Sequence, residues 1–273
     1  MNPESRKPAA PTSAGPSTGS SPFASYPSLR GRTVFITGGS SGIGADLVVA
    51  FAQQGARVGF TGRSAKAAGE VLEATASCES RPIFLQSDAT DVDALRAAVG
   101  QIQREFGEIG VLINNVANDE RHDWSRVSAE AFDRFVAINL RPHFFAAQAT
   151  MPSMLRLGGG SIVNVGSTSW MIKGAGYPVY ATCKSAMVGL TRSLARECGR
   201  HRIRVNTLTP GWIMTPKQLD KWVDAGGERD MDRNQCLPGR IVGADVARLA
   251  LFLASDDSQM ITAQDFIIDA GWT

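Results

Sequence analysis

The chain has 273 residues, of which 43% are hydrophobic and 20% are charged. This composition is typical of a soluble globular protein and is sufficient for one large α/β domain. The formal net charge of +2, spread over scattered Lys and Arg residues, argues against a nucleic-acid partner, and no apolar run approaches the ~18 residues that a membrane span needs. The 4 Cys and 3 His residues lack the spacing of a metal site or a disulfide framework. Reduced thiols and the lack of a signal peptide's apolar core predict a cytoplasmic location.

Two segments of different composition divide the chain. Residues 1–28 consist mainly of Pro, Ser, Ala and Gly, with almost nothing to bury, which predicts a disordered N-terminal arm. From residue 29 to residue 273, short β-branched runs alternate with helical stretches, which predicts a single folded domain.

The strands and helices are predicted in alternation. The predicted strands cover residues 33–37, 57–61, 83–86, 111–114, 161–165, 204–208 and 265–269. Between them, helices are predicted over residues 45–54, from about residue 64, and over residues 177–199. A further helix is predicted to begin at Thr90 and Asp93, which have a capping-box spacing, and to end at Gly107. Because parallel neighbours need a crossover and a helix supplies it, we predict an α/β, doubly wound Rossmann fold with a seven-stranded parallel sheet.

A glycine-rich loop joins the first predicted strand to the first helix, at residues 37–44 with the sequence TGGSSGIG. A backbone that passes close to a pyrophosphate has no room for Cβ atoms, and the helix N-terminus offers free N–H groups and partial positive charge. The alternative is a loop that merely turns the chain. Strand, spacing and helix together favour a dinucleotide site. Its predicted residues are Gly38, Ser40, Ser41, Gly42, Ile43 and Gly44.

A second constellation lies downstream, at Ser167, Tyr180 and Lys184. Ser167 follows the fifth predicted strand, while Tyr180 and Lys184 are four residues apart on a predicted helix and so share one of its faces. The alternative is a pair of surface side chains. A free phenol titrates near pH ~10, and a lysine cation about 4 Å away can lower that value by about three units. We therefore predict that Lys184 lowers the pKa of Tyr180, that Tyr180 transfers the proton, and that Ser167 holds the substrate oxygen.

From about residue 28 to residue 273, the chain resembles the short-chain dehydrogenase/reductase family. The resemblance rests on TGxxxGIG at residues 37–44, Asp88, Asn114-Asn115, Asn139, Ser167, Tyr180 with Lys184, and Pro210-Gly211 followed by Thr215. It implies a fourth catalytic residue, Asn139, which kinks its helix and positions a water, and a Lys184 that also binds the nicotinamide ribose. The further cofactor-binding residues that it implies are Asp88, Ala89, Asn115, Pro210, Gly211, Ile213 and Thr215, besides Tyr180 and Lys184 themselves.

Two of these residues have structural alternatives, and two positions depart from the family pattern. Asn139 fits a helix cap and Asp88 fits a turn. The family's Asn-Asn-Ala-Gly ends here in Ala117, which narrows the space beside the adenosine half, and the glycine usual after Thr262 is Ala263. Neither departure removes a reacting group.

The cofactor is predicted to be NADP in preference to NAD. NAD-specific proteins place an acidic residue at the end of the second strand, where it binds the ribose hydroxyl and repels a phosphate. Here that place holds Gly62 and Arg63, and Arg63 is a planar cation suited to a phosphate. Because Ser40 and Ser41 add no second basic residue, use of both cofactors stays open.

The predicted substrate is a free aldose, oxidised at its anomeric carbon to a lactone. The run from Asn118 to His122, the pair Ser169-Trp170 and the ending Asp269-Ala-Gly-Trp-Thr273 resemble the bacterial sugar 1-dehydrogenases of the family, which act on xylose, arabinose, galactose or fucose. The predicted substrate residues are Asn118, Arg121, His122, Ser169 and Trp170. Three alternatives stay open: a solvated polar loop at residues 118–123, a ketone or 3-oxoacyl thioester reductase, and a non-catalytic cofactor-binding protein.

The predicted helical stretches also suggest self-association. Residues 129–157 and 177–199 are apolar over more than one face, as Phe132, Phe135, Phe144 and Phe145 illustrate. The family resemblance implies a homotetramer.

Overall fold

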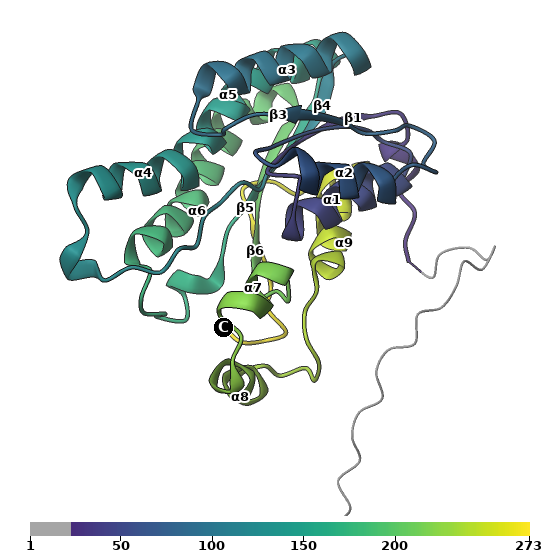
Figure 1. Cartoon of the computed structure of the whole chain (residues 1–273). Helices are drawn as coiled ribbons and strands as arrows, with labels where there is room; N and C mark the ends of the chain where they lie inside the picture. Colours follow the sequence, from purple (N-terminus) through teal and green to yellow (C-terminus); the bar gives the residue numbers. More distant parts are fainter. Residues whose placement is uncertain (1–22) are drawn as a thin grey trace, which may run out of the picture.

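The computed structural model describes residues 23–273 (Figure 1). The strands are β1 (Thr33–Thr37), β2 (Arg57–Gly62), β3 (Ile83–Gln86), β4 (Ile109–Asn114), β5 (Gly160–Val165), β6 (Ile203–Pro210) and β7 (Asp265–Ile268). The helices are α1 (Gly42–Gln53), α2 (Ala65–Ala74), α3 (Val92–Phe106), α4 (Ala129–Asn139), α5 (Arg141–Leu157), α6 (Pro178–Cys198), α7 (Pro216–Lys221), α8 (Ala225–Asn234) and α9 (Gly243–Ala254).

One parallel sheet organises these elements, in the order β3-β2-β1-β4-β5-β6-β7. The predicted doubly wound fold is therefore confirmed, and each predicted strand overlaps an observed one. The largest differences in bounds are at β4, which begins at Ile109 rather than at residue 111, and at β6, which runs on to Pro210. The strand order reverses between β1 and β4. At such a switch point the loops that follow the two strands separate and leave a crevice between them.

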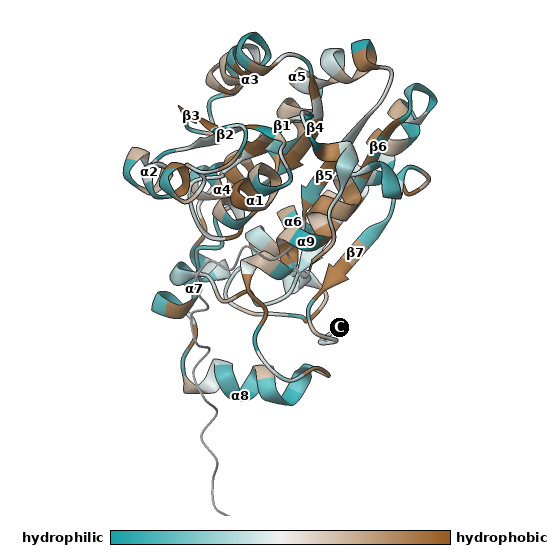
Figure 2. Cartoon of the chain, turned by 90° about the vertical axis from the view of Figure 1, so that its right-hand side faces the viewer, coloured by the Kyte–Doolittle hydropathy of each residue, from teal (hydrophilic) through white to brown (hydrophobic). Residues whose placement is uncertain are grey.

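Helices cover both faces of the sheet (Figure 1). Val34 and Ile36 of β1 point toward α1 and α9, whereas Phe35 between them packs with Leu112 and Ile162 on the opposite face, against α3, α5 and α6. Because helices cover both faces, every residue of β1, β4 and β6 is buried, and Figure 2 shows brown, hydrophobic stretches in the strands.

The start of α3 differs from the prediction. Asp91, not Thr90, caps this helix, because its Oδ1 accepts hydrogen bonds from the backbone N–H groups of Asp93 and Ala94, both at 2.9 Å. Thr90 instead donates its hydroxyl to Asp88 at 2.8 Å. The predicted end is observed, since Gly107 adopts a φ of 83° after the last turn.

The predicted N-terminal arm lies for the most part outside the described residues, since residues 1–22 are not among them. Residues 23–28, which the prediction included, have defined contacts. Tyr26 packs against the core, and its backbone N–H donates to Oε1 of Gln54 at 2.8 Å. A short 3-10 helix follows at Pro27–Leu29 and buries Leu29. The folded part therefore begins before residue 29.

Ala263, which replaces the family's glycine, adopts a left-handed backbone with a φ of 62°. This conformation costs a residue with a Cβ atom about 1–2 kcal/mol of conformational energy. The neighbouring contacts hold it there, because its N–H donates to the carbonyl of Val205 at 2.8 Å and its side chain packs against the core.

Within residues 23–273, no helix is long and apolar enough to cross a membrane. In the same part of the chain, no group of three or more His, Cys, Asp or Glu side chains is placed to hold a metal ion.

Candidate active site

A cavity of about 590 Å³ opens at the carboxyl edge of the sheet. It extends from the crevice between β1 and β4 to the loops that follow β5 and β6, and α7 and the chain's C-terminus lie at the same end of the sheet (Figure 1). This is where parallel sheets of this topology bind ligands.

The glycine loop forms one wall of the cavity. A Cβ atom on Gly44 would lie 2.0 Å from the carbonyl oxygen of Gly38 and 2.6 Å from Nδ2 of Asn115, so no side chain fits there. Asn115 fixes the loop by donating to the carbonyls of Thr37 at 3.1 Å and Gly38 at 3.0 Å. The amino end of α1 follows directly at Gly42, and the hydroxyl of its N-cap residue, Ser41, makes no capping hydrogen bond. A close, side-chain-free loop leading into a helix N-terminus fits the pyrophosphate of a nicotinamide dinucleotide.

Of the residues predicted to bind the cofactor, all but Asp88 line this cavity. They are Gly38, Ser40, Ser41, Gly42, Ile43, Gly44, Arg63, Ala89, Asn115, Tyr180, Lys184, Pro210, Gly211, Ile213 and Thr215. Asp88 is exposed, and its Oδ1 accepts from the N–H and the hydroxyl of Thr90, at 2.9 and 2.8 Å. These hydrogen bonds lower the pKa of Asp88 and give it the geometry of a turn residue.

Ser167, Tyr180 and Lys184 meet in the cavity beyond the glycine loop. Ser167 follows β5, and Tyr180 and Lys184 lie one turn apart on α6. Lys184 is only 1% exposed; its ammonium donates to the carbonyl of Val165 at 2.7 Å and lies 5.8 Å from the centre of the Tyr180 ring. Burial lowers the pKa of Lys184 to about 8.

The electrostatics of Tyr180 differ from the prediction. Burial raises the pKa of its phenol well above 10, and a hydrogen bond with Ser167 offsets only part of this rise. The charge of Asp119 raises it further. The prediction that Lys184 supplies most of a three-unit fall in the pKa of Tyr180 is therefore wrong, because desolvation of the phenolate outweighs an ammonium at this distance.

Asn139 lies at the break between α4 and α5 and is fully buried. Its Oδ1 accepts from the backbone N–H of Asn118 at 2.7 Å, and its Nδ2 donates to the carbonyls of Asn118 and Phe135, both at 3.1 Å. The amide therefore ties the loop after β4 to α4, the helix that packs against α6. It does not line the cavity itself.

The predicted substrate residues separate into two groups. Arg121 and Ser169 line the cavity, but Asn118, His122 and Trp170 do not. His122 instead caps α6: its Nε2 accepts from the N–H of Val179 at 3.3 Å, while its Nδ1 lies 3.1 Å from the carbonyl of Glu120. Because Nε2 accepts, Nδ1 carries the proton, and both ring nitrogens are used inside the protein.

Several cavity residues were absent from the predicted substrate set. They are Asp119, Ile172, Tyr177, Trp212, Lys217, Gln218, Asp230 and Trp272. What these residues share is their place in the fold: most of them lie on α7 or within a few residues of the carboxyl end of β4, β6 or β7.

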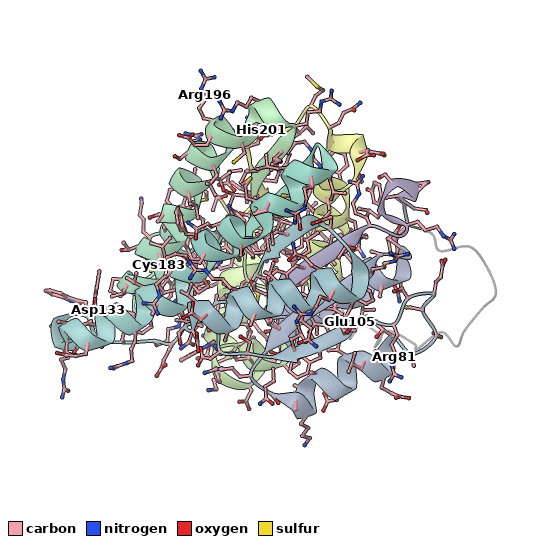
Figure 3. The ribbon with its side chains drawn as sticks, turned by 90° about the horizontal axis from the view of Figure 1, so that it is seen from above. Arg81, Glu105, Asp133, Cys183, Arg196 and His201 are labelled. Atoms are coloured by element: carbon pink, nitrogen blue, oxygen red, sulfur yellow. The ribbon has the colours of Figure 1, made fainter. Side chains whose placement is uncertain are left out.

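Cys183, next to Lys184 on α6, is 2% exposed, and burial raises the pKa of its thiol (Figure 3). This fits the predicted role of a packed residue rather than a nucleophile.

Comparison with known proteins agrees with this geometry. A family model described as enoyl-(acyl carrier protein) reductase matches residues 38–273. The probable galactose dehydrogenase GalD of Rhizobium meliloti (strain 1021) is 43% identical over 251 residues, which are 92% of this chain and 98% of that protein. The D-xylose 1-dehydrogenase of Caulobacter vibrioides (strain NA1000 / CB15N) is 41% identical over 247 residues, 90% of this chain and 98% of that protein. A solved short-chain dehydrogenase/reductase from Serratia marcescens BCRC 10948 superposes with a TM-score of 0.83 at 31% identity and covers 90% of this chain and 99% of its own.

The chain belongs to the short-chain dehydrogenase/reductase family, whose dehydrogenases use NAD(P) to oxidise or form CH–OH groups. The predicted family and enzyme class are confirmed.

Proposed function

We propose that the enzyme oxidises the anomeric hydroxyl of an aldose to a lactone. One observation carries this proposal: polar side chains and two indole rings line the same cavity as Tyr180. Asp119, Arg121 and Ser169 supply charged and hydroxyl groups, and Trp212 and Trp272 lie with their ring centres 6.4 Å apart. A sugar needs both kinds of surface, since its hydroxyls require hydrogen bonds and its ring has apolar faces. The names of the galactose and xylose dehydrogenases support the same substrate class.

In the proposed mechanism, Tyr180 is the general base and Ser167 orients the substrate. The Ser167 hydroxyl holds the anomeric oxygen beside the phenol, so that the proton leaves through Tyr180. A bound oxidised nicotinamide would supply the hydride acceptor, and its positive ring would favour the phenolate of Tyr180 before the transfer. Lys184 donates its ammonium to the Val165 carbonyl, 5.8 Å from the centre of the Tyr180 ring. In this mechanism it stabilises the phenolate and would hold the nicotinamide ribose. Asn139 holds the loop after β4 in place and thereby positions this wall.

The substrate class is tested with an aldose panel in the presence of NADP and NAD, run beside an acetoacetyl thioester with the reduced cofactors. We expect lactone formation from one or two aldoses, followed at the absorbance band of the reduced cofactor and by hydroxamate detection of the lactone. Turnover of the thioester without turnover of any aldose would identify a ketone or 3-oxoacyl thioester reductase instead. Silence toward every substrate, with cofactor still bound, would favour a non-catalytic protein.

For the cofactor, we propose NADP in preference to NAD, on the basis of Gly62 and Arg63. A Cβ on Gly62 would lie 2.3 Å from Oγ and 2.8 Å from Cβ of Ser40, so an acidic residue, as in NAD-specific enzymes, has no room. Arg63 lines the cavity and its side chain is exposed, which leaves the guanidinium accessible to a ribose phosphate.

We expect Arg63→Ala to lower kcat/KM for NADP by about tenfold, the effect of one lost charge-assisted hydrogen bond, and to leave kcat/KM for NAD within about twofold. Arg81→Ala is the matched control, because Arg81 is an exposed arginine outside the cavity (Figure 3). A wild-type enzyme that favours NAD tenfold would contradict the proposal.

We also propose a homotetramer. Phe132 on α4 and Phe144 on α5 are 45% and 44% exposed, and apolar side chains left open on neighbouring helices favour burial against another subunit. Sedimentation equilibrium should give about four times the chain mass of 29.1 kDa, and a monomeric mass would contradict this state.

The cytoplasmic location stays a prediction.

A further inference from the structure

Asp119 occupies an unusual position in the cavity. It follows β4 by five residues, but its carboxylate reaches across the cavity to α7. One oxygen pairs with Nζ of Lys217, and the other accepts from Nε2 of Gln218 at 2.6 Å. Burial alone would raise the pKa of Asp119, but the hydrogen bond and charge of Lys217 hold it below its ordinary value, so the group is a carboxylate at neutral pH.

These two contacts leave part of the carboxylate free. A carboxylate has about four lone-pair sites, and Lys217 and Gln218 occupy one on each oxygen. The backbone N–H of Asp119 itself also donates to this carboxylate, so one acceptor site remains open, and the Asp119 side chain is still 22% exposed. An open acceptor site on a rigidly held carboxylate matches a hydroxyl of a ligand.

The same hydrogen-bond chain fixes the orientation of Trp212. Oε1 of Gln218 accepts from the indole Nε1 of Trp212 at 2.9 Å, so the only polar atom of the indole is already paired. A Cβ on Gly227 of α8 would lie 2.7 Å from the Trp212 ring, which shows that α8 packs tightly behind it. The indole therefore offers the cavity an apolar surface next to the Asp119 carboxylate.

Two further groups complete the arrangement. The Arg121 guanidinium lies 4.1 Å from the centre of the Tyr177 ring and 5.0 Å from that of Trp222, and this stacking holds a cation with several N–H donors at the cavity. Ser169 is buried, lines the cavity, and its Oγ has no hydrogen-bond partner within the described residues. A buried hydroxyl without a partner costs free energy that a ligand hydroxyl would recover.

We infer that Asp119 is the specificity-determining residue for polyhydroxy substrates: its carboxylate accepts a hydrogen bond from a substrate hydroxyl away from the reacting carbon, while the ring lies against Trp212. This inference rests on the proposed aldose oxidation and extends it to a substrate subsite. Arg121 and Ser169 complete the subsite as donors. A substrate without this hydroxyl gains nothing from Asp119.

The test compares an aldopyranose that the wild type oxidises with 2-hydroxytetrahydropyran, which has the same ring and anomeric hydroxyl but no other hydroxyl group. Asp119→Asn keeps the shape and replaces one acceptor oxygen by an NH₂ donor. We expect kcat/KM for the aldose to fall by about 10- to 100-fold, the range for losing a hydrogen bond to a charged group, mainly through KM. For 2-hydroxytetrahydropyran we expect a change of less than about threefold. Any effect of the lost charge on Tyr180 acts on both substrates and cancels in their ratio.

Three further variants make the result decisive. Asp133→Asn removes a carboxylate on α4, outside the cavity, and should leave both substrates unchanged (Figure 3). Asp119→Glu keeps the charge but displaces it, so it should reproduce the aldose-specific loss even if Asp119→Asn folds poorly. Lys217→Met removes the partner on α7 and keeps the acceptor, so it should cost the aldose less than Asp119→Asn does.

Two outcomes would overturn the inference. Equal losses for both substrates in Asp119→Asn and Asp119→Glu would mean that the carboxylate only holds α7. If Lys217→Met and Asp119→Asn cause the same aldose-specific loss of kcat/KM, the loss is due to the ion pair and not to a free acceptor on Asp119. A wild type that oxidises 2-hydroxytetrahydropyran but no aldose would refute the proposed function itself, and this is seen before any variant is made.

Discussion

Replacing Tyr180 by Phe should lower kcat by about three orders of magnitude, while the affinity for the cofactor stays within about twofold. The change deletes one oxygen and little volume. It removes the group that takes the substrate proton. Ser167 cannot replace this group, because a serine hydroxyl is a far weaker acid than a phenol and does not form the anion that would accept the proton. Single-turnover rates and cofactor titration by fluorescence measure the two quantities separately.

Tyr177→Phe is the matched control for this variant. Tyr177 lines the same cavity, with its ring 6.1 Å from that of Tyr180, but its aromatic face is occupied by Arg121. Tyr177→Phe should keep more than about a tenth of the wild-type rate, because Tyr177 affects the reaction only indirectly. Retention of a tenth of the rate by Tyr180→Phe would remove Tyr180 from the mechanism.

Replacing Lys184 by Met should lower kcat by about 100-fold or more and raise the dissociation constant of the cofactor by about tenfold. One ammonium serves both the phenol and the cofactor ribose in the proposed mechanism, so both measurements should change together. A variant with slow turnover but unchanged cofactor affinity would contradict the dual role.

The same variant should lose stability relative to the wild type as the pH rises from neutral to alkaline. Lys184 is 1% exposed and its pKa is lowered to about 8, so the folded protein gives up this proton at lower pH than the unfolded chain does. Below about pH 8 both states hold the proton, and burying the cation destabilises the wild type. Between about pH 8 and 10.4, only the unfolded state binds it, so wild-type stability rises with pH by about 3 kcal/mol. Urea unfolding at pH 7 and pH 10 should show the variant losing stability relative to the wild type as the pH rises; an unchanged difference would contradict the burial of a charged Lys184.

The accuracy of the sequence-based prediction differed between the two halves of the site. The strands and the cofactor wall were predictable because the signals are local: β1 is a buried β-branched run, and the following loop excludes Cβ atoms by its own backbone path at Gly38 and Gly44. Family resemblance then supplied distant cofactor positions such as Ile213 and Thr215, which do line the cavity.

The substrate wall was predicted only in part, because side-chain direction in a loop depends on contacts that are distant in sequence. His122 has the right chemistry for a sugar, but the N–H of Val179 takes its Nε2. Asp119, three residues earlier, reaches the cavity because Lys217 and Gln218 lie opposite it, 98 and 99 residues further along the chain. The raised pKa of Tyr180 was missed for a related reason, since desolvation depends on the packed environment and not on the spacing to Lys184.

The strand order has an evolutionary consequence. Asp119 follows β4, Ser169 follows β5, Trp212 follows β6 and Trp272 follows β7, so the segments after four adjacent strands form the substrate wall, while the glycine loop belongs to β1. Segments that a rigid sheet holds in place tolerate replacement better than the sheet itself. A lineage with this architecture can exchange its substrate one loop at a time and keep hydride chemistry intact throughout the divergence.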